Sequence, residues 1–406
     1  MFHAMRASDK RRTAAGCYDA AMRALPSFPV LARAVGRRIM RALGRERDPF
    51  GDVPEGLSLS PSQRHFAAYK TAPLKLRYAG GGWPDAAEWQ RSARETLAGL
   101  SGYERGAAPP VPHHEQSFAL TGGLTRRRVY LAAGPGTDIP VHLIERPSGE
   151  AARPVMICLQ GTNTGAHLSW GEVRFPDDAD KRRRGYDIAV QAAERGYLAV
   201  ALEQACFGER AERRIAPRSE QPCIDASLHA LLLGRSLLGE RCSDVSAAID
   251  WIAADRARLR ADPRRIHVMG HSSGGTTAMY AAALDPRIAA VLACGCVGFV
   301  RDTIGRRRDN SGQGTVPGLL KFMESADVVG LIAPRPFVTV AGDSDHIWPA
   351  AGAASVVAEA RAIYTALGAA DLIDCVTEPG GHSFRPEPSW RAFEAALERQ
   401  RQATAR

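Results

Sequence analysis

The feature that most constrains the fold is a change of pattern at about residue 115. From there, short apolar runs typical of strands alternate with stretches of helical periodicity. The first runs, at Phe118–Leu120, Arg127–Ala132 and Ile139–Glu145, are separated by Gly/Pro turns and predict an antiparallel beginning. The later alternation of strand and helix predicts an α/β fold, with a mostly parallel central sheet covered by helices on both faces.

The expected elements after residue 150 follow from the same periodicities. Strands are predicted at Val155–Gln160, Leu198–Leu202, Ile266–Met269, Ile288–Cys294, Phe337–Val340 and Leu372–Val376. Helices are predicted at Tyr186–Arg195, Ser227–Ala257, Thr276–Leu284, Ala351–Leu367 and Trp390–Arg401.

Residues 1–47 predict a separate, basic, amphipathic helical leader. Leu31, Val35, Ile39 and Leu43 recur every four residues as an apolar stripe, beside an arginine stripe of the same spacing. Such a helix could contact an anionic membrane surface weakly or dock on a partner. The alternative is a helix that packs on the main domain, or an extension that is poorly ordered.

The remainder divides into two predicted regions. Residues 48–112 form a helical accessory segment, in which Asp85 caps a helix with an apolar face. Residues 113–406 form the main domain. Within it, the insert 299–332 fits neither the strand nor the helix pattern, and it is either a lid over a site or a solvated surface excursion.

Composition limits the classes of protein to which the chain can belong. Of its 406 residues, 45% are hydrophobic, which is enough for a large core. The net charge is +9, but the leader holds eleven basic residues against three acidic ones, so the rest of the chain is nearly neutral. Because the basic charge does not map onto the main domain, we predict no nucleic-acid partner.

Cysteine usage and missing motifs narrow the chemistry further. The eight cysteines are scattered without a Cys-x-x-Cys pair, which predicts reduced, mostly buried thiols and no metal site. No nucleotide-binding or zinc-protease motif occurs, so no cofactor is predicted. No signal peptide and no membrane-spanning run is evident, which predicts a cytoplasmic protein.

One pentapeptide carries a specific chemical signal. Gly270-His271-Ser272-Ser273-Gly274 lies between a predicted strand and a predicted helix. In that context the Gly-x-Ser-x-Gly pattern forms a sharp turn that presents the serine hydroxyl at the carboxyl end of a sheet. The pattern therefore predicts Ser272 as a nucleophile.

A serine needs a base, and the base needs an orienting acid. In folds with this turn the chain order is serine, acid, histidine, and Asp345 and His382 follow Ser272 in that order at turns after strands. His382 is the predicted general base and Asp345 its acid. Asp343, two residues away, is the alternative acid or else caps a turn.

Two backbone N–H groups are expected to form an oxyanion hole. One belongs to Ser273, the residue after the nucleophile, and the other to the loop after Val155–Gln160. We expect Thr162 to supply the second N–H, with Asn163 as the alternative.

Together these stretches give the chain a family likeness over about residues 115–395. The phrases that carry it are the pentapeptide, Cys158–Thr162, Ala205–Arg210, Ala230–Arg235, Gly330–Pro336 and Gly380–His382. The chain resembles the bacterial acetyl-xylan-esterase-like and dienelactone-hydrolase-like branch of the α/β-hydrolase superfamily. It departs from many relatives in carrying Gln160-Gly161 where they have His-Gly, and the leader lies outside the likeness.

The resemblance implies an α/β-hydrolase fold and a Ser–His–Asp esterase mechanism without a metal. We therefore expect a small-molecule ester substrate, with a short acyl or acetyl group. A lactone, thioester, peptide or C–C bond hydrolase with the same triad stays open, as does a non-catalytic ligand-binding protein on this fold. The sequence does not specify the oligomeric state.

Overall fold

The computed structural model describes residues 54, 56–134, 136–146, 151–162, 165–212, 222–306 and 312–404. The predicted leader, residues 1–47, lies outside this range. The chain divides into two compact units, Met1–Arg64 and His65–Arg406, and the sheet and the candidate site belong to the second. Among the described residues, no helix is both long and apolar enough to span a bilayer.

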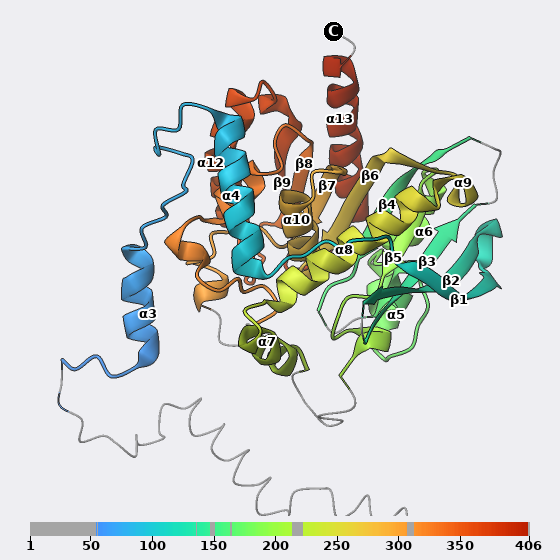
Figure 1. The fold of residues 1–406 in the computed structure, drawn as a ribbon, viewed down its shortest axis with the longest axis horizontal. Coiled ribbons are helices and arrows are strands. Elements are labelled where there is room, and N and C mark those ends of the chain that lie inside the picture. The colour runs from blue at the N-terminus through green and yellow to red at the C-terminus, as the bar shows by residue number, and fades with distance from the viewer. Residues whose placement is uncertain are drawn as a thin grey trace, which may run out of the picture. The chain divides into compact units, whose positions relative to one another are not determined.

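The second unit is built on a nine-stranded sheet in the order β1-β2-β3-β5-β4-β6-β7-β8-β9 (Figure 1). Strands β1, β2, β3 and β5 pair in antiparallel fashion, and β5, β4, β6, β7, β8 and β9 pair in parallel. The strands are β1 (Val111–Ala119), β2 (Thr125–Gly134), β3 (Thr137–Glu145), β4 (Arg153–Leu159), β5 (Leu198–Leu202), β6 (Ala261–His271), β7 (Ile288–Cys294), β8 (Phe337–Gly342) and β9 (Ile373–Glu378).

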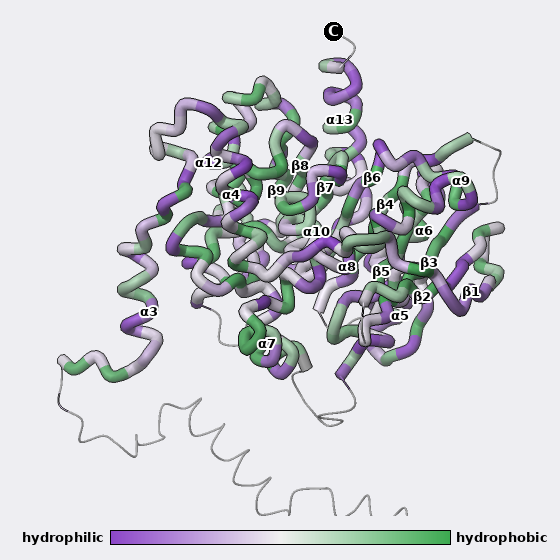
Figure 2. Tube along the Cα trace, viewed as in Figure 1, coloured by the Kyte–Doolittle hydropathy of each residue, from purple (hydrophilic) through white to green (hydrophobic). Residues whose placement is uncertain are grey.

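Both faces of the central strands of the sheet are buried, which explains why these strands are apolar. On β4, Val155, Ile157 and Leu159 belong to the hydrophobic core on one face. Met156 and Cys158, which alternate with them, belong to the core on the other face. A strand with two buried faces needs a continuous apolar run rather than an alternating one. Figure 2 shows this hydrophobic interior along the central strands.

Helices form a layer on each side of the sheet. Those on one face include α4, α8, α10, α11 and α12, and those on the other include α6 and α13. The helices are α3 (Pro61–Lys70), α4 (Ala86–Ser101), α5 (Asp178–Arg183), α6 (Ile188–Glu194), α7 (Pro222–Leu232), α8 (Leu237–Ala254), α9 (Arg256–Leu259), α10 (Ser273–Leu284), α11 (Ser325–Gly330), α12 (Ala350–Ala366) and α13 (Pro386–Thr404). The predicted α/β fold is confirmed.

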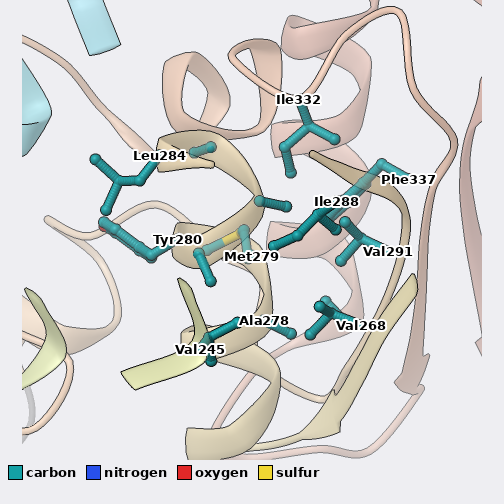
Figure 3. Close-up of a cluster of buried hydrophobic side chains, with 14 of the residues drawn as sticks. Val245, Val268, Ala278, Met279, Tyr280, Leu284, Ile288, Val291, Ile332 and Phe337 are labelled. Carbon is teal, nitrogen blue, oxygen red and sulfur yellow. The ribbon is translucent and has the colours of Figure 1, made fainter. Parts of the chain in front are cut away.

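Helix α10, which begins directly after Ser272, is held in the centre of this structure. All of its residues are buried. Figure 3 shows Ala278 and Met279 of this helix beside Val268 of β6 and Val291 of β7. Such packing fixes the start of the helix relative to the end of β6, and that junction carries the candidate nucleophile.

The long helical region predicted over Ser227–Ala257 is helical but divided. The structure has α7, α8 and α9 there, and the first two are separated at Leu233–Ser236. Gly234 adopts a left-handed φ of 70°, and Ser236 begins α8 as an N-cap whose side chain accepts the N–H of Gly239. Glycine reaches this conformation without a Cβ penalty, and serine is a favoured cap, so both residues break the helix locally.

The predicted accessory segment shares a core with the sheet. Asp85 caps α4 as expected, because its side chain accepts the N–H of Ala87 at 2.8 Å. Trp89 and Leu97 of that helix are fully buried in the same hydrophobic core as β4. Strand β1 begins at Val111, so the predicted boundary at residue 112 falls inside a strand.

Candidate active site

The pentapeptide forms a strained turn between β6 and α10. Ser272 has φ 55° and ψ −121°, a conformation that L-residues rarely adopt. A Cβ on Gly270 would collide with the backbone of Gly274, and a Cβ on Gly274 would collide with the backbone oxygen of Leu159. The two glycines are therefore required by close backbone approach, and the serine is fixed at the tip of the turn.

The three predicted triad residues lie in one hydrogen-bonded line. His382 Nε2 is 3.0 Å from Ser272 Oγ, and His382 Nδ1 is 2.7 Å from Asp345 Oδ2. With Nδ1 protonated toward the carboxylate, Nε2 is the acceptor that faces the serine hydroxyl. This arrangement can take the serine proton and hold the resulting imidazolium against a carboxylate.

Asp345 is buried and strongly hydrogen-bonded. Its Oδ1 accepts the backbone N–H groups of Ile347 at 2.8 Å and Trp348 at 2.9 Å. Burial alone would raise the pKa of Asp345, but the bonds from His382 and these two amides outweigh it, so the pKa lies below its usual value. The carboxylate is therefore ionised and fixed in orientation at neutral pH.

Asp343, the alternative acid, has a different task in the structure. Its Oδ1 accepts the N–H of Gly380 at 2.9 Å, and its own N–H donates to Glu378 O. These bonds tie the loop after β8 to the loop that carries His382. Asp343 thus positions that loop, while Asp345 is the acid in contact with the histidine.

His271 forms a buried wall behind His382. Its ring centroid lies 4.7 Å from that of His382, and its Nε2 has no hydrogen-bond partner among the described residues. Burial, with the charge of His382, lowers the pKa of His271 to about 3. A neutral ring here packs on His382 without adding a second positive charge.

The predicted oxyanion residues flank Ser272. Ser273 is the first residue of α10, and a Cβ built on Gly161 would lie 3.5 Å from the Cβ of Ser272. The loop containing Thr162 therefore passes beside the serine. Asn163, the alternative donor, lies outside the described residues. Because the helix amino terminus also points here, the site favours developing negative charge.

Gln160, the departure from the family pattern, holds this loop in place through side-chain and backbone hydrogen bonds. Its Nε2 donates to Ser169 Oγ at 2.7 Å and to the carbonyl of Tyr186 at 2.9 Å. Its backbone carbonyl accepts from Gln204 Nε2 at 2.6 Å, and Gln204 in turn accepts the hydroxyl of Thr277 on α10. This network fixes the end of β4 relative to the helix behind the nucleophile.

Gln313, from the insert 299–332, bridges the two predicted oxyanion residues. Its Nε2 donates to Thr162 Oγ1 at 3.0 Å, and its Oε1 accepts from Ser273 Oγ at 2.8 Å. The insert therefore contacts the site through at least this side chain, while its action as a lid stays a prediction. No sequence motif marked Gln313, because its role depends on a contact between distant segments.

Arg241, from α8, supports the same side of the site. Its side chain is buried, and its Nη1 donates to Ser273 Oγ at 3.0 Å and to Gln313 Oε1 at 3.2 Å. Its Nε and Nη2 donate to the carbonyl of Ala205 at 3.2 and 2.7 Å. Among the described residues no carboxylate forms an ion pair with it, and burial lowers the pKa of Arg241. Sequence reasoning missed this buried cation, since nothing in an amphipathic helix distinguishes an inward-facing arginine from a solvated one.

Two further histidines take no part in the line of hydrogen bonds from Ser272 to Asp345. His167 is buried with its Nε2 2.8 Å from Asp178 Oδ2. His346 is exposed. Within the described ranges, no group of three or more His, Cys, Asp and Glu side chains is arranged to hold a metal ion.

A mostly parallel sheet with a serine at the strained β6–α10 turn defines the α/β-hydrolase class. Residues 84–362 match the model of the Abhydrolase family, and the chain belongs to that family. This confirms the resemblance to α/β-hydrolases drawn from the sequence.

Individual relatives agree with the family assignment. A Bacillus subtilis (strain 168) protein named "Putative hydrolase YtaP" is 31% identical over 190 residues, which are 46% of this chain and 60% of that protein. The match thus spans less than two thirds of that relative.

Solved structures share the fold at low sequence identity. One, titled "a putative acetyl xylan esterase", from Bacteroides fragilis NCTC 9343, is 20% identical, with a TM-score of 0.64 over 84% of this chain and 91% of that one. A glucuronoyl esterase from Teredinibacter turnerae T7901 is 17% identical, with a TM-score of 0.57 over 91% of this chain and 99% of that one.

Proposed function

We propose that this protein is a serine hydrolase that cleaves a carboxylic ester with a short acyl group. The observation that carries the proposal is the line of hydrogen bonds from Ser272 Oγ through His382 to Asp345. The names of the structural neighbours, an acetyl xylan esterase and a glucuronoyl esterase, support ester cleavage.

In the proposed reaction, His382 Nε2 takes the proton from Ser272 Oγ as the oxygen attacks the ester carbonyl. The backbone N–H groups of Ser273 and Thr162 donate to the oxygen that becomes negative. His382 then gives its proton to the leaving alcohol, and an acyl-enzyme remains. A water molecule, activated by His382 in the same way, releases the acid and regenerates the serine.

A small acyl group suits the side chains beside the nucleophile. Thr162, Ser273 and Gln313 present hydroxyl and amide groups that hydrogen-bond to one another. A long alkyl chain placed against them would cover little apolar surface of the protein, so it would add little binding free energy. Acetyl and other short esters do not depend on that gain.

The proposal is tested by hydrolysis of p-nitrophenyl acetate with wild type and Ser272→Ala. We expect kcat to fall by at least about 10⁴-fold in the variant, because a Ser–His–Asp unit loses nearly all of its effect when the nucleophile is removed. Ser355→Ala, on the exposed face of α12, is the matched control and should keep wild-type turnover. Equal turnover in wild type and Ser272→Ala would disprove the mechanism.

The length of the acyl group is a separate question with its own comparison. We expect kcat/KM for acetate and propionate esters to exceed that for octanoate by at least tenfold, roughly the effect of about 1.4 kcal/mol. A preference for octanoate, or for a lactone or thioester in the same panel, would contradict the short-chain proposal while leaving the triad intact.

A further inference from the structure

Two thiols of the second unit belong to one small buried cluster. Cys206 follows β5 with a left-handed φ of 73°, and Cys223 is in the first turn of α7. Both are buried, and they form a small apolar cluster with Phe207 and Leu237, separate from the cores on the two faces of the sheet. Each thiol shifts the pKa of the other. The two cysteines come from different elements, so no sequence motif marked them as neighbours.

A buried guanidinium faces this pair. Arg241 Nη2 donates to Cys223 Sγ at 3.7 Å, and its guanidinium carbon lies 4.4 Å from the centre of the Phe207 ring. The neighbouring Arg210 is bound to Asp244, whereas Arg241 has no carboxylate partner among the residues that the structure describes. The group nearest to Arg241 that can become an anion is therefore a thiol.

The surroundings divide the two thiols into different roles. The neighbouring Cys206 thiol and the charge of Arg241 lower the pKa of Cys223, although burial opposes them. The same contact, together with burial, raises the pKa of Cys206. A thiolate beside a cation, with a second thiol in contact, is the arrangement found in reactive dithiols.

We propose that Cys206 and Cys223 form a redox-active dithiol that a peroxide oxidises to an intrachain disulfide. The Cys223 thiolate attacks one oxygen of hydrogen peroxide, the O–O bond breaks, and the leaving hydroxide becomes water on gaining a proton. The sulfenic acid that remains is attacked by the Cys206 sulfur, which loses its proton as the S–S bond forms and a second water leaves. The two sulfurs lose two electrons in total, and the peroxide gains them.

The test uses the full-length, reduced protein and hydrogen peroxide at equal concentration. After blocking of free thiols and digestion, mass spectrometry should find the peptides of Cys206 and Cys223 linked, with the link reversed by dithiothreitol. Cys375 is an internal control, because it is partly exposed yet burial raises its pKa to about 11. We expect the link to form roughly ten times faster, or more, than Cys375 reacts, since only a thiolate attacks.

Two variants separate the two steps. Cys206→Ser should stop at a Cys223 sulfenic acid that dimedone captures, whereas Cys223→Ser should lose the fast reaction. Circular dichroism of the reduced variants checks that they fold, and Cys375→Ser should keep the link. The proposal is overturned if Cys375 oxidises first while Cys206 and Cys223 remain open to alkylation, or if either is found linked to a different cysteine. Neither outcome depends on whether the protein hydrolyses esters.

Discussion

The two sides of Ser272 are built in different ways. On one side, Asp345 and His382 follow β8 and β9, strands that are parallel neighbours in the sheet. On the other side, Thr162, Ser273, Gln313 and Arg241 come from four separate segments and meet through side-chain hydrogen bonds. We call these the triad side and the oxyanion side.

The difference follows from sheet geometry. Gly342 of β8 pairs with Glu378 of β9, so residues shortly after each position emerge at the same edge of the sheet. Asp345 and His382 meet there because the register requires it. The oxyanion side has no such rule, since Gln313 reaches it from an irregular insert and Arg241 from the buried face of a helix. One side is fixed by backbone topology, and the other by tertiary contacts.

Substitutions on the triad side should lower kcat the most. Asp345→Asn should lower kcat by about 10³–10⁴-fold, because the amide cannot stabilise the imidazolium and favours the wrong tautomer of His382. Asp343→Asn is the matched control, since the amide oxygen can still accept the N–H of Gly380, and it should stay within about threefold of wild type. Steady-state kinetics of both variants measure the difference. If Asp343→Asn were the slower enzyme, the assignment of Asp345 as the acid of the triad would be contradicted.

Substitution of Arg241, the cation of the oxyanion side, should lower kcat less. Arg241→Met should lower kcat by about 10–100-fold, because Ser273 and Gln313 lose their shared donor. The free energy of unfolding should fall by about 1–3 kcal/mol, since the carbonyl of Ala205 loses the donors of Arg241.

Arg210→Met is the matched control for that variant. It leaves Asp244 without its partner, so it should cost more stability, about 3 kcal/mol, and much less kcat. Urea denaturation and steady-state kinetics measure the two quantities separately. The reverse ranking in kcat would show that Arg241 acts on stability alone.

The bridge across the oxyanion side should have a moderate effect. Gln313→Ala removes the contacts with Thr162 and Ser273, and we expect kcat to fall by roughly tenfold, which corresponds to about 1.4 kcal/mol. KM should change less than kcat if the bridge holds donors for the transition state. Gln402→Ala, on the exposed end of α13, is the control. A change confined to KM would assign Gln313 to substrate binding instead.

Substitution of His271 should have the smallest effect on turnover, and its main effect should be on the pH dependence of stability. Its folded pKa of about 3 lies below the usual value of about 6.5, so the unfolded chain binds more protons between these values. Stability from the neutral ring is therefore present above about pH 6.5 and is lost as the pH falls toward 3.

His271→Phe keeps a flat buried ring and removes this titration. The slope of unfolding free energy against pH between about 4 and 6 should decrease by as much as about 1.4 kcal/mol per pH unit. His229→Phe, at an exposed position on α7, should leave the slope unchanged. Denaturation at several pH values measures both, and an unchanged slope in His271→Phe would contradict a neutral, buried ring.

The sequence predicted elements whose signal is local. Ile288–Cys294 was expected as a strand and is β7, because a short, wholly apolar run suits a strand buried on both faces. The long helical region predicted over Ser227–Ala257 is divided in the structure, because its apolar residues continue across Gly234 while the backbone turns there. The spacing of apolar residues does not report a single residue with positive φ.

The candidate site divides in the same way. Ser272, Asp345 and His382 could be predicted as site residues because each follows a predicted strand. The structure brings their three side chains together. The contact of Gln313 with the site could not be predicted, because an irregular insert has no periodicity that indicates which side chains face inward. The proximity of Cys206 and Cys223 could not be predicted either, because it depends on how the loop after β5 and helix α7 pack together.

Covalent labelling of the folded protein with a fluorophosphonate tests directly whether Ser272 is an activated nucleophile. A serine activated by a histidine forms a stable adduct with this probe, whereas an ordinary serine does not. We predict one adduct per chain, located at Ser272 by peptide mapping, absent in Ser272→Ala and at least about 10²-fold slower to form in His382→Ala. Folded wild-type protein that stays unlabelled, or that is labelled at another serine, would contradict the account.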